Sequence, residues 1–432
     1  MRGESMLFAA FVAGAALAGH GNVTFYRDVL PILQERCQSC HRAGEAAPMT
    51  LASYGDARPW AKAIREAVIS RKMPPWFADP RYGKFANERS LLQSEIDTLV
   101  AWVDAGAAPG NPAEAPAPKV FPEGWSIGTP DVILEMPQPF EVPASGGVDY
   151  QYVLVPTRFA EDRWVERVEV QPGNRSVAHH LVVFTREPGS NLLRNLKPGV
   201  PFGLPPPKRR PAANNSAGLF LDTPGQEVLG VYVPGGVAWQ LEPGQARRIP
   251  AGSDLIFQVH YTPNGTPAAD RSRVGLVFAR TQPRERVRSI VVANPFLRIP
   301  PGAADFPVEA RVTLSAPARL VSLFPHMHVR GKSFEYRALY PGGDSEILLK
   351  IPRYDFNWQL TYRLERARLL PAGTVLVCAA RYDNSAANPA NPDPGAEVAW
   401  GDQTWEEMLA GFMDLAFDAG ADPRAVVGPQ KP

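Results

Sequence analysis

Five of the seven histidines in this chain lie in three short apolar segments. His326 and His328 are two residues apart, and side chains with that spacing project from the same face of a strand. His179 and His180 are adjacent, and His260 lies in the apolar segment 255–261. Neutral imidazole is the commonest side-chain ligand of transition metals, so this clustering predicts metal binding.

The adjacent pair places a condition on the first cluster. Neighbouring residues of a strand point to opposite faces, so His179 and His180 can bind one ion only where the strand twists or bulges. With that condition met, His260 would complete a site of three imidazoles.

The second cluster needs a third ligand, and Met408 is the candidate. A thioether is soft and suits Cu(I), whereas zinc prefers harder or thiolate ligands. His326, His328 and Met408 together therefore indicate copper. A core methionine on an apolar strand is the alternative interpretation of Met408.

A third candidate site lies near the N-terminus. Cys37, Cys40 and His41 form the pattern Cys-x-x-Cys-His, which attaches a c-type haem through two thioethers and one axial histidine. A zinc half-site and a redox dithiol are the alternatives. Zinc would need two more ligands, and residues 19–106 contain no other Cys or His except His20.

The sixth ligand of a c-type haem iron is expected to be methionine, which raises the reduction potential. Met73 and Met49 are the candidates in the same region. Met49 follows His41 by eight residues, which leaves little chain to reach the opposite face of the haem. Met73 is therefore favoured.

The N-terminal residues resemble a signal peptide at 1–18, with Arg2, an apolar run and the small residues Ala16 and Ala18 before the cleavage point. A buried helix or a retained anchor is the alternative. No second long apolar run follows, so a periplasmic or secreted protein with no integral membrane span after cleavage is expected. With two cysteines assigned to haem, Cys378 has no partner, and a disulfide-free chain is predicted.

Length and composition predict several domains. A chain of 432 residues suggests about three, and a net charge of +1 argues against a nucleic-acid surface. Helical patterns occupy 19–106, a Pro/Ala linker follows at 107–119, and short strands between Pro/Gly turns continue from residue 130. We expect an N-terminal all-α domain at 19–106 and two all-β sandwich domains, at 120–282 and 283–425.

The order of the motifs HH, QVHY, HMH and EEM, over about residues 120 to 420, resembles the copper type II, ascorbate-dependent monooxygenases. That family includes peptidylglycine α-hydroxylating monooxygenase and dopamine β-monooxygenase. The resemblance implies two jelly-roll domains with one copper ion each. His179, His180 and His260 match the copper that passes an electron, and His326, His328 and Met408 match the catalytic copper that activates oxygen. Residues 23–106 resemble the small cytochrome c modules of exported bacterial proteins, with Met73 as the axial methionine.

The expected function is an exported haem- and copper-containing monooxygenase that hydroxylates a C–H bond of a small organic substrate with O2. Its cofactors would be one covalent haem c and two copper ions. Its external electron donor would be a reduced cytochrome, an ascorbate-like reductant or a quinol chain. Phe324, Ala410 and Phe412 replace the Arg, Asn and Tyr of peptide-acting members, so a substrate other than a glycine-extended peptide is expected. A non-oxygenase electron-transfer protein and a structural protein that binds zinc or copper are the alternatives.

Overall fold

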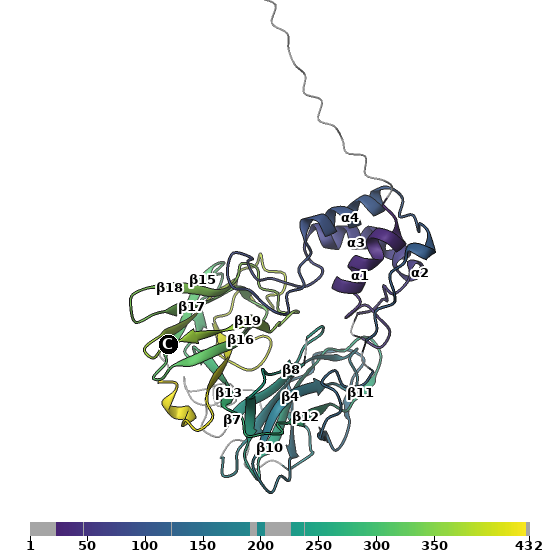
Figure 1. Cartoon of the computed structure of the whole chain (residues 1–432). Helices are drawn as coiled ribbons and strands as arrows, with labels where there is room; N and C mark the ends of the chain where they lie inside the picture. Colours follow the sequence, from purple (N-terminus) through teal and green to yellow (C-terminus); the bar gives the residue numbers. More distant parts are fainter. Residues whose placement is uncertain are drawn as a thin grey trace, which may run out of the picture.

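The computed structural model describes residues 23–45, 47–121, 123–190, 197–203, 226–236 and 238–428. The expected signal peptide at 1–18 and His20 lie outside these ranges. Of the residues described, 37% are in strands and 12% in helices. Figure 1 shows short helices in one part of the molecule and two β-rich parts beside them. No helix in the described ranges is long and apolar enough to cross a membrane.

The N-terminal part contains four short α-helices. They are α1 (Leu30–Arg36), α2 (Tyr54–Ala57), α3 (Ala61–Ile69) and α4 (Gln93–Asp104), with a π turn η1 (Phe25–Val29) before them and 3-10 turns η2 (Arg58–Trp60), η3 (Pro112–Glu114) and η4 (Pro423–Ala425) elsewhere. Ser53 caps α2 in a capping box with Asp56. Leu99 and Trp102 of α4 pack against Phe25 in a small apolar core.

The stretch between α3 and α4 is not helical, and it packs on the β part of the chain. Pro74, Pro75 and Pro80 lack the N–H groups that a helix or a central strand would use. The backbone N–H of Asp79 donates to the Lys350 carbonyl at 2.8 Å, and Phe85 packs its buried ring against Tyr362. The helices are thus attached to the sheets through long-range contacts.

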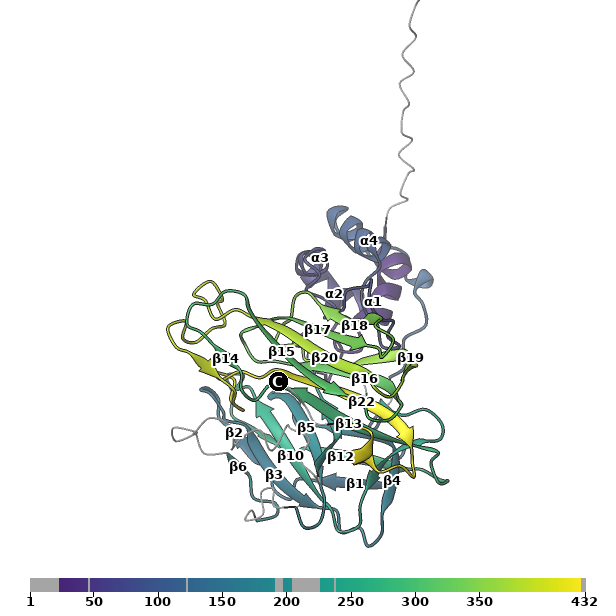
Figure 2. The ribbon, with the colours of Figure 1, turned by 90° about the vertical axis from the view of Figure 1, so that its left-hand side faces the viewer.

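The largest sheet has nine strands, in the order β1-β12-β4-β9-β13-β22-β16-β19 with β8 paired to β4. Its strands are β1 (Val132–Glu135), β4 (Arg163–Gln171), β8 (Trp239–Gln240), β9 (Gln245–Ile249), β12 (Arg273–Phe278), β13 (Glu285–Ala293), β16 (Ala318–His326), β19 (Tyr362–Leu370) and β22 (Ala410–Asp418). Figure 2 shows β13, β22 and β16 side by side. The sheet passes from the first half of the chain to the second where β9 pairs in parallel with β13.

Four smaller sheets complete the β structure. The five-stranded sheet has the order β6-β3-β10-β5-β7, the four-stranded sheet β15-β20-β17-β18, and two pairs are β11-β2 and β14-β21. Their strands are β2 (Phe140–Val142), β3 (Gln151–Pro156), β5 (Ala178–Arg186), β6 (Phe202–Gly203), β7 (Gln226–Tyr232), β10 (Asp254–Tyr261), β11 (Ala268–Asp270), β14 (Arg298–Ile299), β15 (Phe306–Thr313), β17 (Gly331–Leu339), β18 (Ser345–Ile351), β20 (Val375–Tyr382) and β21 (Val398–Ala399).

The predicted fold class, an N-terminal all-α cytochrome c domain followed by two all-β jelly-roll domains, is wrong. The described chain is mostly β with several sheets, and its helices are 4 to 12 residues long. Helical periodicity was present only in short runs, and the longest helix, α4, has 12 residues. The pattern of alternating residues does not show which strands pair with each other. In this structure β9 pairs with β13, so one sheet continues through both halves of the chain.

Both halves also share an apolar core and a buried ionic network. The core combines Tyr150, Tyr152 and Ile256 of the first half with Met408 and Phe412 of the second. In the nine-stranded sheet, Arg247 of β9 donates to Asp414 of β22 at 2.7 Å, and Ser289 of β13 and Ser322 of β16 also donate to Asp414. The halves are therefore held together by packing and by a buried charge pair.

Candidate metal centre

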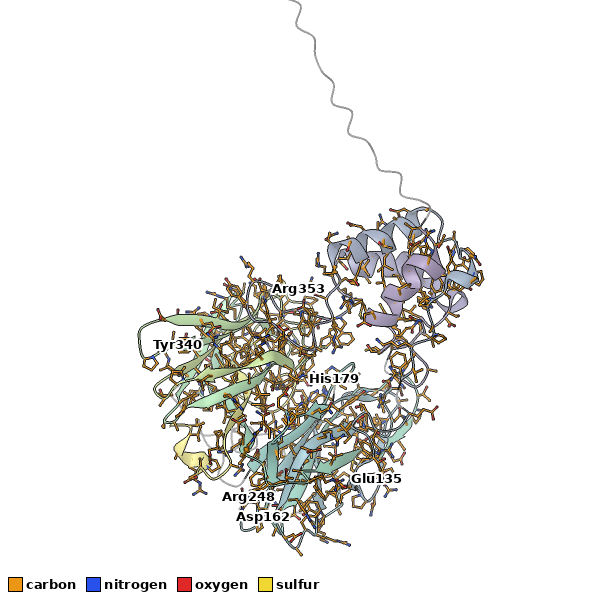
Figure 3. The ribbon with its side chains drawn as sticks, in the orientation of Figure 1. Glu135, Asp162, His179, Arg248, Tyr340 and Arg353 are labelled. Carbon is orange, nitrogen blue, oxygen red and sulfur yellow. The ribbon has the colours of Figure 1, made fainter. Side chains whose placement is uncertain are left out.

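His179, His180 and His260 form one cluster at the end of β5 and β10. His180 pairs with His260 across the two strands, but the next pair is Tyr261 with Ala178, so His179 is an extra residue in a β-bulge. The bulge places two consecutive side chains on one side, which is the condition that the adjacent histidines required. Figure 3 shows His179 near the middle of the molecule, where the helical and β parts approach one another.

The geometry of this cluster suits a metal ion. One ligand atom from each of the three histidines lies within 4.8 Å of the others, and the Nδ1 atoms of His179 and His180 are 3.0 Å apart. Burial lowers the pKa of His179 to about 4 and that of His260 to about 3, and it holds the pKa of His180 well below its usual range. The rings are therefore neutral near pH 7, which is the form that binds a metal.

His326 is the last residue of β16 and His328 follows two residues later, with their ring centroids 5.1 Å apart. His326 Nδ1 bonds to Gln359 Oε1 at 2.6 Å, and His328 Nδ1 bonds to the Glu406 carbonyl at 3.1 Å. Both oxygens are acceptors, so each Nδ1 carries the proton and each Nε2 is the nitrogen that would bind a metal. Such outer hydrogen bonds commonly orient histidine ligands.

Met408 is fully buried and comes just before β22, in which Ala410 pairs with His326. The neighbouring Glu407 carboxylate accepts hydrogen bonds from the backbone N–H groups of His328 at 2.9 Å, Arg330 at 2.7 Å and Met408 at 3.2 Å. Glu407 thereby ties the Met408 segment to the end of the histidine strand. The assignment of Met408 as a copper ligand remains a prediction.

Sequence reasoning missed Glu407 and Gln359. Burial raises the pKa of Glu407 to about 7, although its three backbone hydrogen bonds act in the opposite direction. Its position beside Met408 in the motif EEM was a signal that could have found it. Gln359 lies in a loop without pattern, 33 residues from His326 in sequence, and no local feature pointed to it.

Cys37, Cys40, His41 and Met73 line one cavity of about 350 Å³. His41 Nδ1 donates to the Met49 carbonyl at 3.3 Å, which fixes the ring and leaves Nε2 for an iron. Met49 is thus held beside His41 by its backbone. The thiols of Cys37 and Cys40 are both free, as thioether formation requires.

The cavity wall suits a haem. Prolines 48, 74 and 75, with Val177 and Trp358, make most of the wall apolar. Arg89 also lines it, and none of the described residues forms a hydrogen bond or an ion pair with the Arg89 side chain. Arg36 and Arg175 line the cavity as well, but they form ion pairs with Glu95 and Glu45. A cation in an apolar cavity fits the carboxylates of a haem. His179 lines the same cavity, so the cysteine motif and the first histidine cluster share one space.

Phe324 and Phe412 lie beside His326. Their ring centroids are 6.5 Å and 6.4 Å from that of His326, and 5.5 Å from each other. Both rings belong to the apolar core that the two halves share. The surroundings of the second histidine pair are therefore apolar on this side.

No protein-family model matches this chain, and no curated protein matches it either. Among solved structures it is similar to the structure of infectious bursal disease virus Gx strain, at 10% identity and a TM-score of 0.20, with 68% of this chain and 72% of that chain covered. The VP2 subviral particle of infectious bursal disease virus has 9% identity and a TM-score of 0.20, with 72% and 77% covered. Scores this low carry no argument about fold or function.

Proposed function

We propose that this protein is an exported monooxygenase that binds haem and copper and hydroxylates a C–H bond of a small organic substrate. The reaction consumes the substrate, O2, two electrons and two protons, and yields the hydroxylated product and water. The observation that carries the proposal is the convergence of five neutral histidines, three buried and two half-buried, from distant segments on one locus. The motif order that resembles the copper type II monooxygenases supports copper as the metal.

In this proposal, His179, His180 and His260 hold one copper ion, and His326, His328 and Met408 hold the other. Copper supplies the one-electron and oxygen chemistry that side chains lack. Gln359 and the Glu406 carbonyl orient the second pair of imidazoles, and Glu407 holds the backbone of residues 328, 330 and 408 in register. Phe324 and Phe412 exclude water from one side of His326.

Cys37 and Cys40 would hold the haem through thioethers, and His41 and Met73 would bind its iron. It would store and pass single electrons. The Met49 carbonyl keeps the His41 proton on Nδ1, and Arg89 would neutralise a haem carboxylate. The cavity that these residues share with His179 supports the haem as the electron source for the copper ions.

Metal analysis and oxygen uptake together test the proposal. The purified mature protein should contain one covalent haem and two copper ions per chain. It should consume O2 with a reductant only when an oxidisable organic substrate is present, and the product should carry one oxygen atom from 18O2. Zinc in place of copper would contradict the proposal, as would O2 consumption that forms only peroxide.

A second candidate function is electron transfer without oxygenation, which the shared cavity of Cys37, Cys40 and His179 also favours. In that case the haem and copper centres would exchange electrons rapidly with an external partner. No organic product would form with any of the C–H compounds screened. Incorporation of 18O into a product separates the two functions.

The apolar surroundings of His326 bear on the substrate. Phe324 and Phe412 offer no hydrogen bond or charge to a carboxylate, whereas arginine binds one through two parallel hydrogen bonds. We therefore expect an apolar C–H substrate in place of a glycine-extended peptide. Efficient hydroxylation of glycine-extended peptides would contradict this part of the proposal.

A further inference from the structure

The first set of histidines (His179, His180 and His260) lies against the second set (His326 and His328). The ring centroids of His180 and His326 are 6.4 Å apart, only slightly more than the 5.1 Å between His326 and His328 within one set. His180, His326 and His328 are 3%, 5% and 1% exposed.

One aromatic residue contacts both sets. The Phe356 ring stacks on His179 with a centroid distance of 5.4 Å, and it lies 6.2 Å from His260 and 6.2 Å from His328. Tyr150 stacks on His260 at 4.7 Å and belongs to the same apolar core as Met408. The Phe356 ring therefore packs against histidines of both sets.

The fold keeps the sets at this separation. His326 ends β16 in the nine-stranded sheet, while His180 and His260 lie in the five-stranded sheet. The two sheets meet in the apolar core that contains Tyr150, Ile256 and Phe412. The buried pair Arg247–Asp414 holds the strands of the large sheet across both halves. A change in distance between the sets would have to open this core.

We propose that the five histidines and Met408 form a single binuclear copper site. The sequence had instead predicted two separate sites, with one copper ion in each of two domains. This inference rests on the proposed function in its choice of copper. It goes further because it states that two Cu(II) ions bound to these side chains interact magnetically, and that both ions adjoin one buried space.

Electron paramagnetic resonance of the full-length, haem-containing protein loaded with two equivalents of Cu(II) tests the inference. The ferric haem signal is subtracted with copper-free protein. We expect less than half of the two-spin intensity of uncoupled Cu(II), with a broadened line and a half-field transition. Removal of one set should restore an ordinary signal, so His260→Ala and His328→Ala should each bind one copper ion and give one full spin.

Titration of the unmodified protein provides a measure that does not depend on the folding of variants. The electron paramagnetic resonance intensity per Cu(II) ion should be highest when little Cu(II) is bound, and it should fall as the second ion binds. A full two-spin intensity with two narrow, independent signals would overturn the inference. It would leave the proposed function intact if 18O is still incorporated into product. Failure to bind copper at all would overturn both.

Discussion

Met408 is the single residue on which the choice of metal depends most. A thioether stabilises Cu(I) more than Cu(II), because Cu(I) is the softer ion. Met408→Ala should therefore weaken Cu(I) binding at the second set by at least tenfold while Cu(II) binding changes less, and oxygenation should be lost. Competition with a Cu(I) chelator and a Cu(II) chelator measures the two affinities.

Met413 supplies the matched control for this test. It is a buried methionine on β22, 1% exposed, and it packs in the apolar core of the second half. Met413→Ala should lower stability by about 2 kcal/mol or more through the cavity alone, with both copper affinities unchanged. Equal copper affinities in Met408→Ala and the parent would mean that Met408 is a core residue.

At the haem, Met73→His should leave the cofactor attached and lower its reduction potential. Methionine ligation raises the potential, and an imidazole would stabilise the ferric iron. Met49→Leu is the control, since Met49 contributes only its backbone carbonyl to His41. A spectroelectrochemical titration measures the potential. An unchanged potential in Met73→His, with a shift in Met49→Leu, would reverse the assignment of the axial ligand.

The buried histidines also predict how the copper-free protein responds to pH. An unfolded histidine titrates near 6.5, whereas burial lowers the pKa of His179 to about 4 and that of His260 to about 3 in the folded chain. Between these values the unfolded chain binds more protons than the folded chain. Stability should therefore fall as the pH drops from about 6.5, and the loss should be complete only below the folded pKa values.

Thermal unfolding between about pH 7 and about pH 5 measures this effect. Bound copper should steepen the dependence, because protons then also compete with the metal. His260→Phe should flatten the slope in the copper-free protein, because it removes one group that must stay neutral. A slope that is the same in His260→Phe and the parent would contradict the prediction.

At the scale of elements, the stretch between α3 and α4 attaches the N-terminal helices to β19. Phe85 is 7% exposed and packs against both Trp76 and Tyr362, and the backbone N–H of Ala86 donates to the Arg363 carbonyl at 2.8 Å. Phe85→Ala should cost about 3 kcal/mol, since it leaves a cavity in this contact. Urea unfolding measures the loss.

Leu369 on the same strand β19 is the control, because it is 63% exposed. Leu369→Ala should change stability by less than about 0.5 kcal/mol. Limited proteolysis between residues 70 and 92 should accelerate in Phe85→Ala only. Equal proteolysis of the two variants would show that the helices are attached by other contacts.

At the scale of the whole molecule, Asp414 joins strands from both halves of the chain. It accepts hydrogen bonds from Arg247, Ser289 and Ser322, and the Arg247 side chain is 1% exposed. Asp414→Ala would remove the carboxylate that neutralises the buried Arg247 guanidinium at 2.7 Å. The free energy of unfolding should fall by about 3 kcal/mol. If the two halves separate, the copper-loaded variant should also lose the magnetic coupling between its copper ions.

The exposed pair Arg298–Glu397 is the matched control, with both side chains at least half exposed. Glu397→Ala should cost less than about 1 kcal/mol, because solvent screens the pair. Thermal unfolding of both variants compares the two contributions. Equal losses would mean that the Arg247–Asp414 pair does not hold the halves together.

The sequence by itself supplied the candidate ligands of this protein. The pattern at Cys37, Cys40 and His41 and the two-residue spacing of His326 and His328 follow from covalent order alone. The two-residue spacing predicted that His326 and His328 share one strand face, but β16 ends at His326 and His328 lies two residues beyond it, with the two ring centroids 5.1 Å apart. Met73 could be selected by its distance from His41 along the chain, and it does line the same cavity.

Tertiary structure decided everything that depends on strand pairing. The bulge at His179, the hydrogen bond from His326 to Gln359 and the close approach of His180 to His326 join segments that are distant in sequence. The predicted cytochrome c and jelly-roll domains failed for the same reason. Periodicity reports which face of an element is buried, but the partner of that face is chosen by non-local packing, and here that packing continues one sheet through both halves.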